Sequence, residues 1–265
     1  MRLAEIVDLE RYPVHDPAAR SGLASDLSQQ LAEQSVAVLP GFVRPTALAY
    51  MAADCDRLLH VAHRSESVAS PYLSRPDTSL PAEHPRARAQ HSEVETVAYD
   101  LVPDGAPVRT LYESKELLEF LAEVLEVEEL FHYADPFGAL NLSTMHAGDQ
   151  LAWHFDQTDF VTSIAVAAPD GGGAFEVAAQ VRSEDDEHYD DVAAVLDGDR
   201  SAVTHVEFEP GSLMLFAGRC SLHRVTPVEG TSPRHVALLA YDTRPGTDST
   251  DELKLARYGR LPGGN

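Results

Sequence analysis

Cysteine, basic residues and long apolar runs are all scarce in this sequence, and each scarcity excludes a class of protein. Two cysteines in 265 residues are too few for a disulfide framework. The 20 basic residues face 43 acidic ones, and a formal net charge of −23 disfavours binding to nucleic acid or to anionic membrane surfaces. No apolar run approaches the roughly 20 residues that span a bilayer. Residues 1–8 also lack the apolar segment of a signal peptide.

What is present is the composition of an acidic globular protein. Hydrophobic residues make up 44% of the chain, which is enough for a sizeable core at this length. We find no internal repeat and no long low-complexity linker, so we predict one domain over residues 1–265. With so few cysteines and no leader, we expect a cytoplasmic protein. Whether it forms a homodimer is left open.

The front part of the chain, about 1–130, is predicted to be mainly helical. Leucines recur at helical spacing over 23–31, and Pro45 fits the first turn of a second helix that ends near residue 59. A third helix is expected over 112–125. Between the second and third helices, residues 65–96 hold four prolines among polar residues, which argues against regular helix. A lid over a site and a disordered surface loop are both open interpretations of this stretch.

Short strands dominate the following segment, about 131–245. Turn signals such as Pro169-Asp170-Gly171-Gly172-Gly173 separate them, and a charged loop with a short helix interrupts them at 183–200. Eight strands behind a helical front predict a mainly β fold with flanking helices, in which a cupin-like jelly roll, or double-stranded β-helix, forms the core. We expect residues 246–265 to form a C-terminal tail. The predicted strands are 139–145, 151–154, 160–168, 174–178, 203–208, 212–216, 223–225 and 234–241.

One tripeptide in these strands carries the chemistry. His154 and Asp156 are two residues apart, so in a strand both face the same side. His223 on a later strand would complete a set of two imidazoles and one carboxylate on one face of a metal, an arrangement suited to non-heme Fe(II) with open positions. A second His-x-Asp, at 188–190, lies in an acidic stretch without strand pattern, and we assign it to a solvated loop.

Arg234 strengthens this interpretation because it lies 11 residues beyond His223, at the head of an apolar strand. Arginine holds a carboxylate through two parallel hydrogen bonds, which is what the far carboxylate of 2-oxoglutarate would require.

The order of these residues resembles the Fe(II)/2-oxoglutarate-dependent oxygenases of the double-stranded β-helix fold. The resemblance is closest to a bacterial branch of free-amino-acid halogenases and hydroxylases, and it covers roughly 97–260. It implies an oxidoreductase that uses Fe(II), 2-oxoglutarate and O₂, with His154, Asp156 and His223 as catalytic metal ligands and Arg234 on 2-oxoglutarate. The sequence runs that carry it are Gly148-Asp149-Gln150-Leu151-Ala152-Trp153-His154-Phe155-Asp156, Gly218-Arg219-Cys220-Ser221-Leu222-His223-Arg224-Val225-Thr226-Pro227-Val228 and Tyr241-Asp242-Thr243-Arg244-Pro245-Gly246.

One departure from that branch bears on the reaction. The halogenases that the chain resembles carry a small residue where this chain has Asp156, and the missing carboxylate leaves room for chloride. Asp156 therefore favours hydroxylation of an unactivated C–H bond in a free amino acid or small amino-acid derivative. Ring closure, for example cyclopropane formation on 6-nitronorleucine, and desaturation remain alternatives at the same centre. A non-catalytic cupin-like metal-binding module is the alternative of another class.

The substrate contacts are predicted from strand parity and charge. Leu238 and Ala240 share the parity of Arg234, and as an apolar wall they favour a side chain without a terminal ammonium. Simple packing of the sheet explains them equally well. Arg86 and Arg88 in the polar excursion are candidates for the substrate carboxylate, although surface roles are open. Asn141 is a candidate partner of 2-oxoglutarate or substrate, and a structural hydrogen bond is its alternative.

Overall fold

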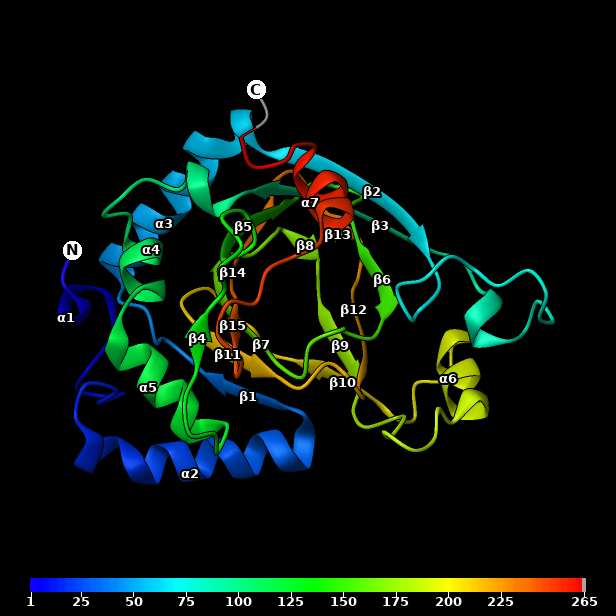
Figure 1. The fold of residues 1–265 in the computed structure, drawn as a ribbon, viewed down its shortest axis with the longest axis horizontal. Helices are drawn as coiled ribbons and strands as arrows, with labels where there is room; N and C mark the ends of the chain where they lie inside the picture. The colour runs from blue at the N-terminus through cyan, green and yellow to red at the C-terminus, as the bar shows by residue number, and fades with distance from the viewer. Residues whose placement is uncertain (264–265) are drawn as a thin grey trace.

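The computed structural model describes residues 1–263, which form two facing antiparallel β-sheets with helices packed on the outside of the larger one (Figure 1). Seven strands make the larger sheet, in the spatial order β1 (Val36–Leu39), β11 (Leu213–Phe216), β7 (Val161–Ala167), β14 (Arg234–Leu239), β5 (Leu140–Met145), β3 (Gln90–Val97) and β2 (His63–Ala69). The smaller sheet has the order β10 (Val203–Val206), β9 (Phe175–Ala178), β12 (Leu222–Val225) and β6 (Leu151–His154). Two short pairs complete the core, β13 (Val228–Glu229) with β8 (Gly171–Gly172), and β15 (Tyr241–Asp242) with β4 (Phe131–His132).

Most helices come from the front part of the chain and gather on one side of the molecule (Figure 1). α2 begins after Asp16, whose carboxylate accepts hydrogen bonds from two main-chain amides of the first turn, and it ends at Ser35 in a left-handed conformation. The α-helices are α1 (Leu3–Ile6), α2 (Pro17–Gln34), α3 (Pro45–Leu58), α4 (Pro107–Tyr112), α5 (Lys115–Val124), α6 (Tyr189–Leu196) and α7 (Asp251–Tyr258), and short 3₁₀ turns cover Leu59–Val61, Pro85–Ala87 and Tyr99–Leu101.

The two faces of the larger sheet bury different sets of side chains, because successive residues of a strand point to opposite sides. On β5, Leu142 belongs to the core between sheet and helices, whereas Met145 belongs to a second cluster between the two sheets. On β11 the same alternation sends Leu215 to the helices and Phe216 to the barrel interior. The interior of the jelly roll is therefore separated from the helical layer by a single sheet.

The fold confirms the predicted jelly roll. Three of the segments predicted outside its strands differ from the structure. The residues at both ends of the 65–96 excursion pair as β2 and β3 and extend the larger sheet, so the irregular loop is confined to 70–89. The single helix predicted over 112–125 is two helices, α4 and α5, separated at Ser114, whose side chain caps the second. The predicted tail contains α7, with Thr250 as its cap. No helix of the described chain is long and apolar enough to cross a membrane.

The helix-facing side of β5 should dominate the stability of the core. Replacing the fully buried Leu142 with alanine leaves a cavity and should lower the free energy of unfolding by about 2–5 kcal/mol. The same truncation at Leu255, which is 48% exposed on α7, should change it by less than about 0.5 kcal/mol. Chemical denaturation of both variants measures the difference, and equal losses would contradict the proposed core.

Candidate metal centre

The strand pairing of the smaller sheet brings two imidazoles together. His154 ends β6 and His223 is the second residue of β12, and the two are direct partners in the antiparallel register. Their ring centroids are 4.1 Å apart. Asp156 follows two residues after His154, and its Oδ1 lies 3.5 Å from Nε2 of His223 and 3.9 Å from Nε2 of His154. One ligand atom from each of the three residues fits within 4.8 Å of the others, so the structure assembles the predicted triad.

Main-chain carbonyls orient both imidazoles for metal binding. Nδ1 of His154 lies 2.8 Å from the carbonyl oxygen of Ala152, and Nδ1 of His223 lies 2.9 Å from that of Ser221. A carbonyl oxygen can only accept, so each Nδ1 carries the proton and donates it. In each ring, Nε2, the nitrogen nearer Asp156, is then the one left to bind a metal. This is the tautomer that a metal-binding imidazole requires.

The protonation states also fit a metal. Burial, reinforced by the neighbouring His223, lowers the pKa of His154 to about 4, so that imidazole is neutral at pH 7. Burial by itself would raise the pKa of Asp156, but the two adjacent imidazoles outweigh it and the pKa is lowered. A neutral nitrogen donor beside an ionised carboxylate is a ligand set suited to Fe(II), and it leaves part of the coordination sphere open.

Gly218 makes the space that the Asp156 carboxylate occupies. The main-chain amide of Asp156 donates to the carbonyl oxygen of Gly218 over 3.1 Å, which holds the two backbones side by side. A Cβ atom added at Gly218 would lie 1.8 Å from Oδ2 of Asp156. Any side chain at this position would therefore displace the carboxylate.

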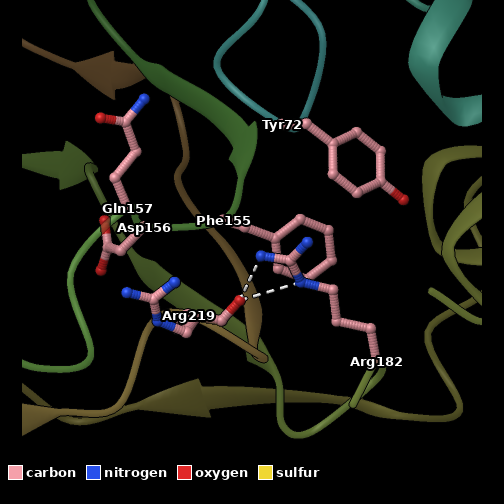
Figure 2. A pocket seen from close by; sticks show the side chains of 6 residues that line it. All are labelled: Tyr72, Phe155, Asp156, Gln157, Arg182 and Arg219. Atoms are coloured by element: carbon pink, nitrogen blue, oxygen red, sulfur yellow. Dashed lines mark hydrogen bonds between the residues drawn. The ribbon is translucent and has the colours of Figure 1, made fainter. Parts of the chain in front are cut away.

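Asp156 also borders a pocket of about 200 Å³ that opens beside the triad (Figure 2). In Figure 2, Arg182 crosses the ring of Phe155 and donates from Nε and Nη2 to the main-chain carbonyl of Arg219. The pocket is lined by Tyr72, Phe155, Asp156, Gln157, Arg182 and Arg219.

Arg234 is the first residue of β14, and it lines a second cavity of about 290 Å³ together with Val236 and Phe175. It forms no ion pair within 4 Å with any described residue. Burial lowers the pKa of Arg234 to about 10, which keeps the guanidinium charged at neutral pH. Glu207 and Glu209 also line this cavity but lie beyond ion-pair distance of Arg234, so the guanidinium is left to pair with an anion that enters.

The topology sets the order of these groups along the barrel. β5 and β6 run in opposite directions and are joined by residues 146–150, so the beginning of β5 and the end of β6 lie at the same end of the barrel. His154 is therefore near the end that holds Asn141, while Arg234 pairs with Met145 near the opposite end of β5. We call the end with His154 and Asn141 the mouth of the barrel.

The other residues predicted to line the site are placed as follows. Leu238 pairs with Asn141, so it shares the interior face at the mouth, and Ala240 follows at the same parity. The Asn141 amide donates to two main-chain carbonyls and accepts from the hydroxyl of Tyr258, which is the structural role left open for it. A contact of Asn141 with 2-oxoglutarate or substrate stays a prediction.

Arg86 and Arg88, the predicted carboxylate ligands, are engaged elsewhere in the structure. Arg86 pairs with Glu187 at 3.0 Å and lies over the ring of Tyr72, and Arg88 pairs with Asp197 at 2.6 Å. Neither lines the pocket beside Asp156. They fasten the 70–89 loop to the segment around α6, and their binding to substrate stays a prediction.

Sequence reasoning missed the contributions of Gly218 and of α7. Nothing in the sequence marks Gly218 as the neighbour of Asp156, because the two meet only through the packing of separate segments. α7 was assigned to the tail, although Thr250 followed by two acidic residues is a helix-start signal.

An ion-pair network fixes the turn that leads into β6. Asp149, only 3% exposed at its side chain, accepts from Nη2 of Arg64 at 2.6 Å and from the main-chain amide of His146 at 2.8 Å. Burial would raise the pKa of Asp149, but the hydrogen bonds from Arg64 and His146 lower it overall. The edge strand β2 is thereby tied to the segment that carries His154.

The comparisons with known proteins agree with this geometry. The family model described as Halogenase D matches residues 19–253. A search of curated protein sequences finds no significant match. Among solved structures, the epimerase SnoN in complex with Fe³⁺, alpha ketoglutarate and nogalamycin RO superposes with a TM-score of 0.59 at 15% identity, over 94% of this chain and 93% of that one.

Two further structures show the same fold. AviO1 from Streptomyces viridochromogenes has a TM-score of 0.56 at 17% identity, covering 84% of this chain and 96% of its own. A 2OG-Fe(II) oxygenase family oxidoreductase from Burkholderia pseudomallei has a TM-score of 0.52 at 16% identity, covering 84% and 92%.

Jelly roll, metal triad and family together define the chain as a non-heme iron and 2-oxoglutarate-dependent oxygenase. Within that class it belongs to the Halogenase D family, whose model spans most of its length. Its HxD triad retains the carboxylate of Asp156.

Substituting Gly218 with alanine should weaken metal binding at least tenfold, because the new methyl group would push the Asp156 carboxylate out of the triad. Calorimetric titration with Fe(II) under anaerobic conditions measures this. Gly22→Ala is the matched control, since nothing lies within 4 Å of a Cβ atom there. Unchanged affinity in Gly218→Ala would remove Asp156 from the metal site.

Replacing Arg64 with glutamine should lower the free energy of unfolding by about 1–2 kcal/mol at pH 7, because Asp149 is left buried without its cation. Since folding lowers the pKa of Asp149, this stabilisation is present above its ordinary value of 3.8 and is lost as the pH falls below it. Denaturation of wild type and variant should therefore converge below that pH. A difference that persists there would point to lost packing instead.

Proposed function

We propose that this enzyme hydroxylates an unactivated C–H bond of a free amino acid or small amino-acid derivative. The observation that carries the proposal is the complete triad of His154, Asp156 and His223 in a barrel that also holds the unpaired cation Arg234. Together with 2-oxoglutarate and O₂, Fe(II) supplies the oxidising power to break such a bond.

The protein's own residues hold the reactants in order. The two Nε2 atoms and one carboxylate oxygen of the triad would hold the metal by one face. Arg234, deeper along the larger sheet, would bind the far carboxylate of 2-oxoglutarate through two parallel hydrogen bonds. The cosubstrate would then extend from the triad into the barrel, which leaves the mouth for the substrate. The hydrophobic interior around Phe216 and Phe175 would exclude water from the cosubstrate.

Oxygen transfer, rather than halogen transfer, is supported by Asp156. A halide needs a position on the metal, and the carboxylate takes that position. Gly218 reserves space for the carboxylate. Although the family is described as Halogenase D, we propose that this member acts as a hydroxylase.

Ring closure or desaturation is the second candidate, because it would use the same triad. The observation in its favour is the apolar Leu238, which faces the interior at the mouth between its cross-strand neighbours Asn141 and Ser163. Leu238 itself offers no partner to a side-chain ammonium, and it suits an aliphatic or nitro-bearing chain such as that of 6-nitronorleucine. Product mass separates the two outcomes, since hydroxylation adds one oxygen and ring closure removes two hydrogens.

The test is incubation with Fe(II), 2-oxoglutarate, O₂ and a pool of lysine, ornithine, leucine, norleucine and 6-nitronorleucine, followed by mass spectrometry. Substrate-dependent succinate with an oxygen-containing product supports hydroxylation, and a product lighter by two hydrogens supports ring closure. A chlorinated product in chloride buffer would contradict the role given to Asp156. His154→Ala is the inactive control.

Arg234→Gln should raise the KM for 2-oxoglutarate by about 10- to 100-fold, because a charge-assisted bidentate contact is lost. The KM for the amino acid should change little. Arg244→Gln, at a side chain that is 82% exposed, removes the same charge and should change neither constant. If only the amino-acid KM rises in Arg234→Gln, the arginine belongs to the substrate site.

A further inference from the structure

Two separate backbone segments meet at the carboxylate of Asp156. Asp156 lies two residues beyond the end of β6, and Gly218 lies two residues beyond the end of β11. Both positions are therefore outside the regular strands, where the hydrogen-bond ladders of the sheets would fix them. The amide of Asp156 donates to the carbonyl oxygen of Gly218, and the space for the carboxylate depends on this close approach. The triad thus needs something else to hold the two segments at the right separation.

Arg182 contacts both of these segments with one guanidinium group (Figure 2). The face of the group lies over the ring of Phe155, 4.1 Å from the ring centroid. Its edge donates two hydrogen bonds to the carbonyl oxygen of Arg219, from Nε over 2.9 Å and from Nη2 over 2.6 Å. Phe155 directly precedes Asp156 in the sequence, and Arg219 directly follows Gly218. A single side chain therefore bridges the two segments immediately beside the carboxylate.

The structure also holds Arg182 itself in a fixed orientation. Its third guanidinium nitrogen, Nη1, donates to Oε2 of Glu187 over 2.9 Å, and its side chain is only 17% exposed. The other oxygen of Glu187 pairs with Arg86 of the 70–89 loop at 3.0 Å. The main-chain amide of Arg182 donates to the carbonyl oxygen of Cys220. Every nitrogen of the guanidinium thus has a partner, so the bridge has little freedom to move.

We propose that Arg182 is a positioning residue of the metal centre, which fixes the Asp156 carboxylate through Phe155 and Arg219 without touching the metal. Only a planar guanidinium can stack on a ring with its face while its edge donates parallel hydrogen bonds. The inference concerns the triad, and it holds whichever substrate the enzyme accepts. Arg182 also lines the pocket beside Asp156, so the experiment must separate this role from direct contact with the substrate.

The test is Fe(II) binding to Arg182→Gln, measured by anaerobic calorimetry in the presence of 2-oxoglutarate. The affinity should fall by about tenfold or more, because the carboxylate of Asp156 loses its fixed position. The visible absorption of the complex of enzyme, Fe(II) and 2-oxoglutarate depends on the ligands of the iron, and it should shift in the same variant. Neither measurement uses an amino-acid substrate, so a failure of the proposed hydroxylation leaves this test unaffected.

Arg200→Gln is the matched control, because Arg200 also stacks on an aromatic ring next to a metal ligand. It lies over the ring of Trp153, 5.5 Å from the centroid, and Trp153 directly precedes His154. It also pairs with a glutamate, Glu176, at 2.9 Å. Its side-chain hydrogen bond goes to that glutamate on β9 rather than to either segment at Asp156. The variant should therefore bind Fe(II) as the wild type does.

Arg182→Lys keeps the positive charge for Glu187 but lacks the planar group, so its affinity for Fe(II) should lie between those of the wild type and Arg182→Gln. Chemical denaturation shows whether each variant is folded, and the lysine variant replaces the glutamine variant if the latter is not.

Three results would overturn the role of Arg182. Wild-type affinity and absorption in the glutamine variant, or in the lysine variant where it replaces it, would show that the bridge does not fix Asp156, and a raised KM for the amino acid alone would make Arg182 a substrate ligand. Full restoration by lysine would mean that the charge matters rather than the planar bridge. An equal loss in Arg200→Gln would make the effect a general one.

Discussion

The antiparallel register between β6 and β12 is the constraint on which the site depends. Because His154 and His223 are direct partners, their imidazoles are adjacent before any metal is present. The carbonyls of Ala152 and Ser221, each two residues before its histidine, then fix both rings in the same tautomer. A slip of one residue would turn one imidazole to the opposite face of the sheet. The rest of the fold preserves this register, as the tie between Arg64 and Asp149 before β6 illustrates.

The barrel of this acidic protein contains a positive charge that the overall composition does not predict. The chain is strongly acidic, yet Arg234 lies in its cavity without an ion-pair partner among residues 1–263. The acidic surface repels large polyanions, whereas a small carboxylate can enter the cavity and pair with Arg234. This arrangement suits an enzyme that takes a dicarboxylate as its cosubstrate.

The strands of the core and the shared face of His154 and Asp156 follow from local rules, so the sequence alone predicts them. His223 joins these two residues only through the register of β6 and β12. Alternation places His154 and Asp156 on one side, and the turn residues mark the strand ends. What the sequence could not supply are meetings between distant segments. Gly218 is identified as the neighbour of Asp156 only by their packing. Likewise, only the structure shows that Arg86 forms an ion pair with Glu187, and that Tyr258 of α7 donates a hydrogen bond to Asn141.

Two positions of this chain, rather than one, decide whether a carboxylate can occupy the third place of the triad. A carboxylate at residue 156 can reach the metal only if residue 218 has no side chain, because a Cβ atom there would overlap Oδ2. The hydrogen bond from the amide of Asp156 to the carbonyl of Gly218 keeps the two backbones at this separation. Asp156 and Gly218 therefore act as one structural unit, because the carboxylate fills the space that the missing side chain leaves.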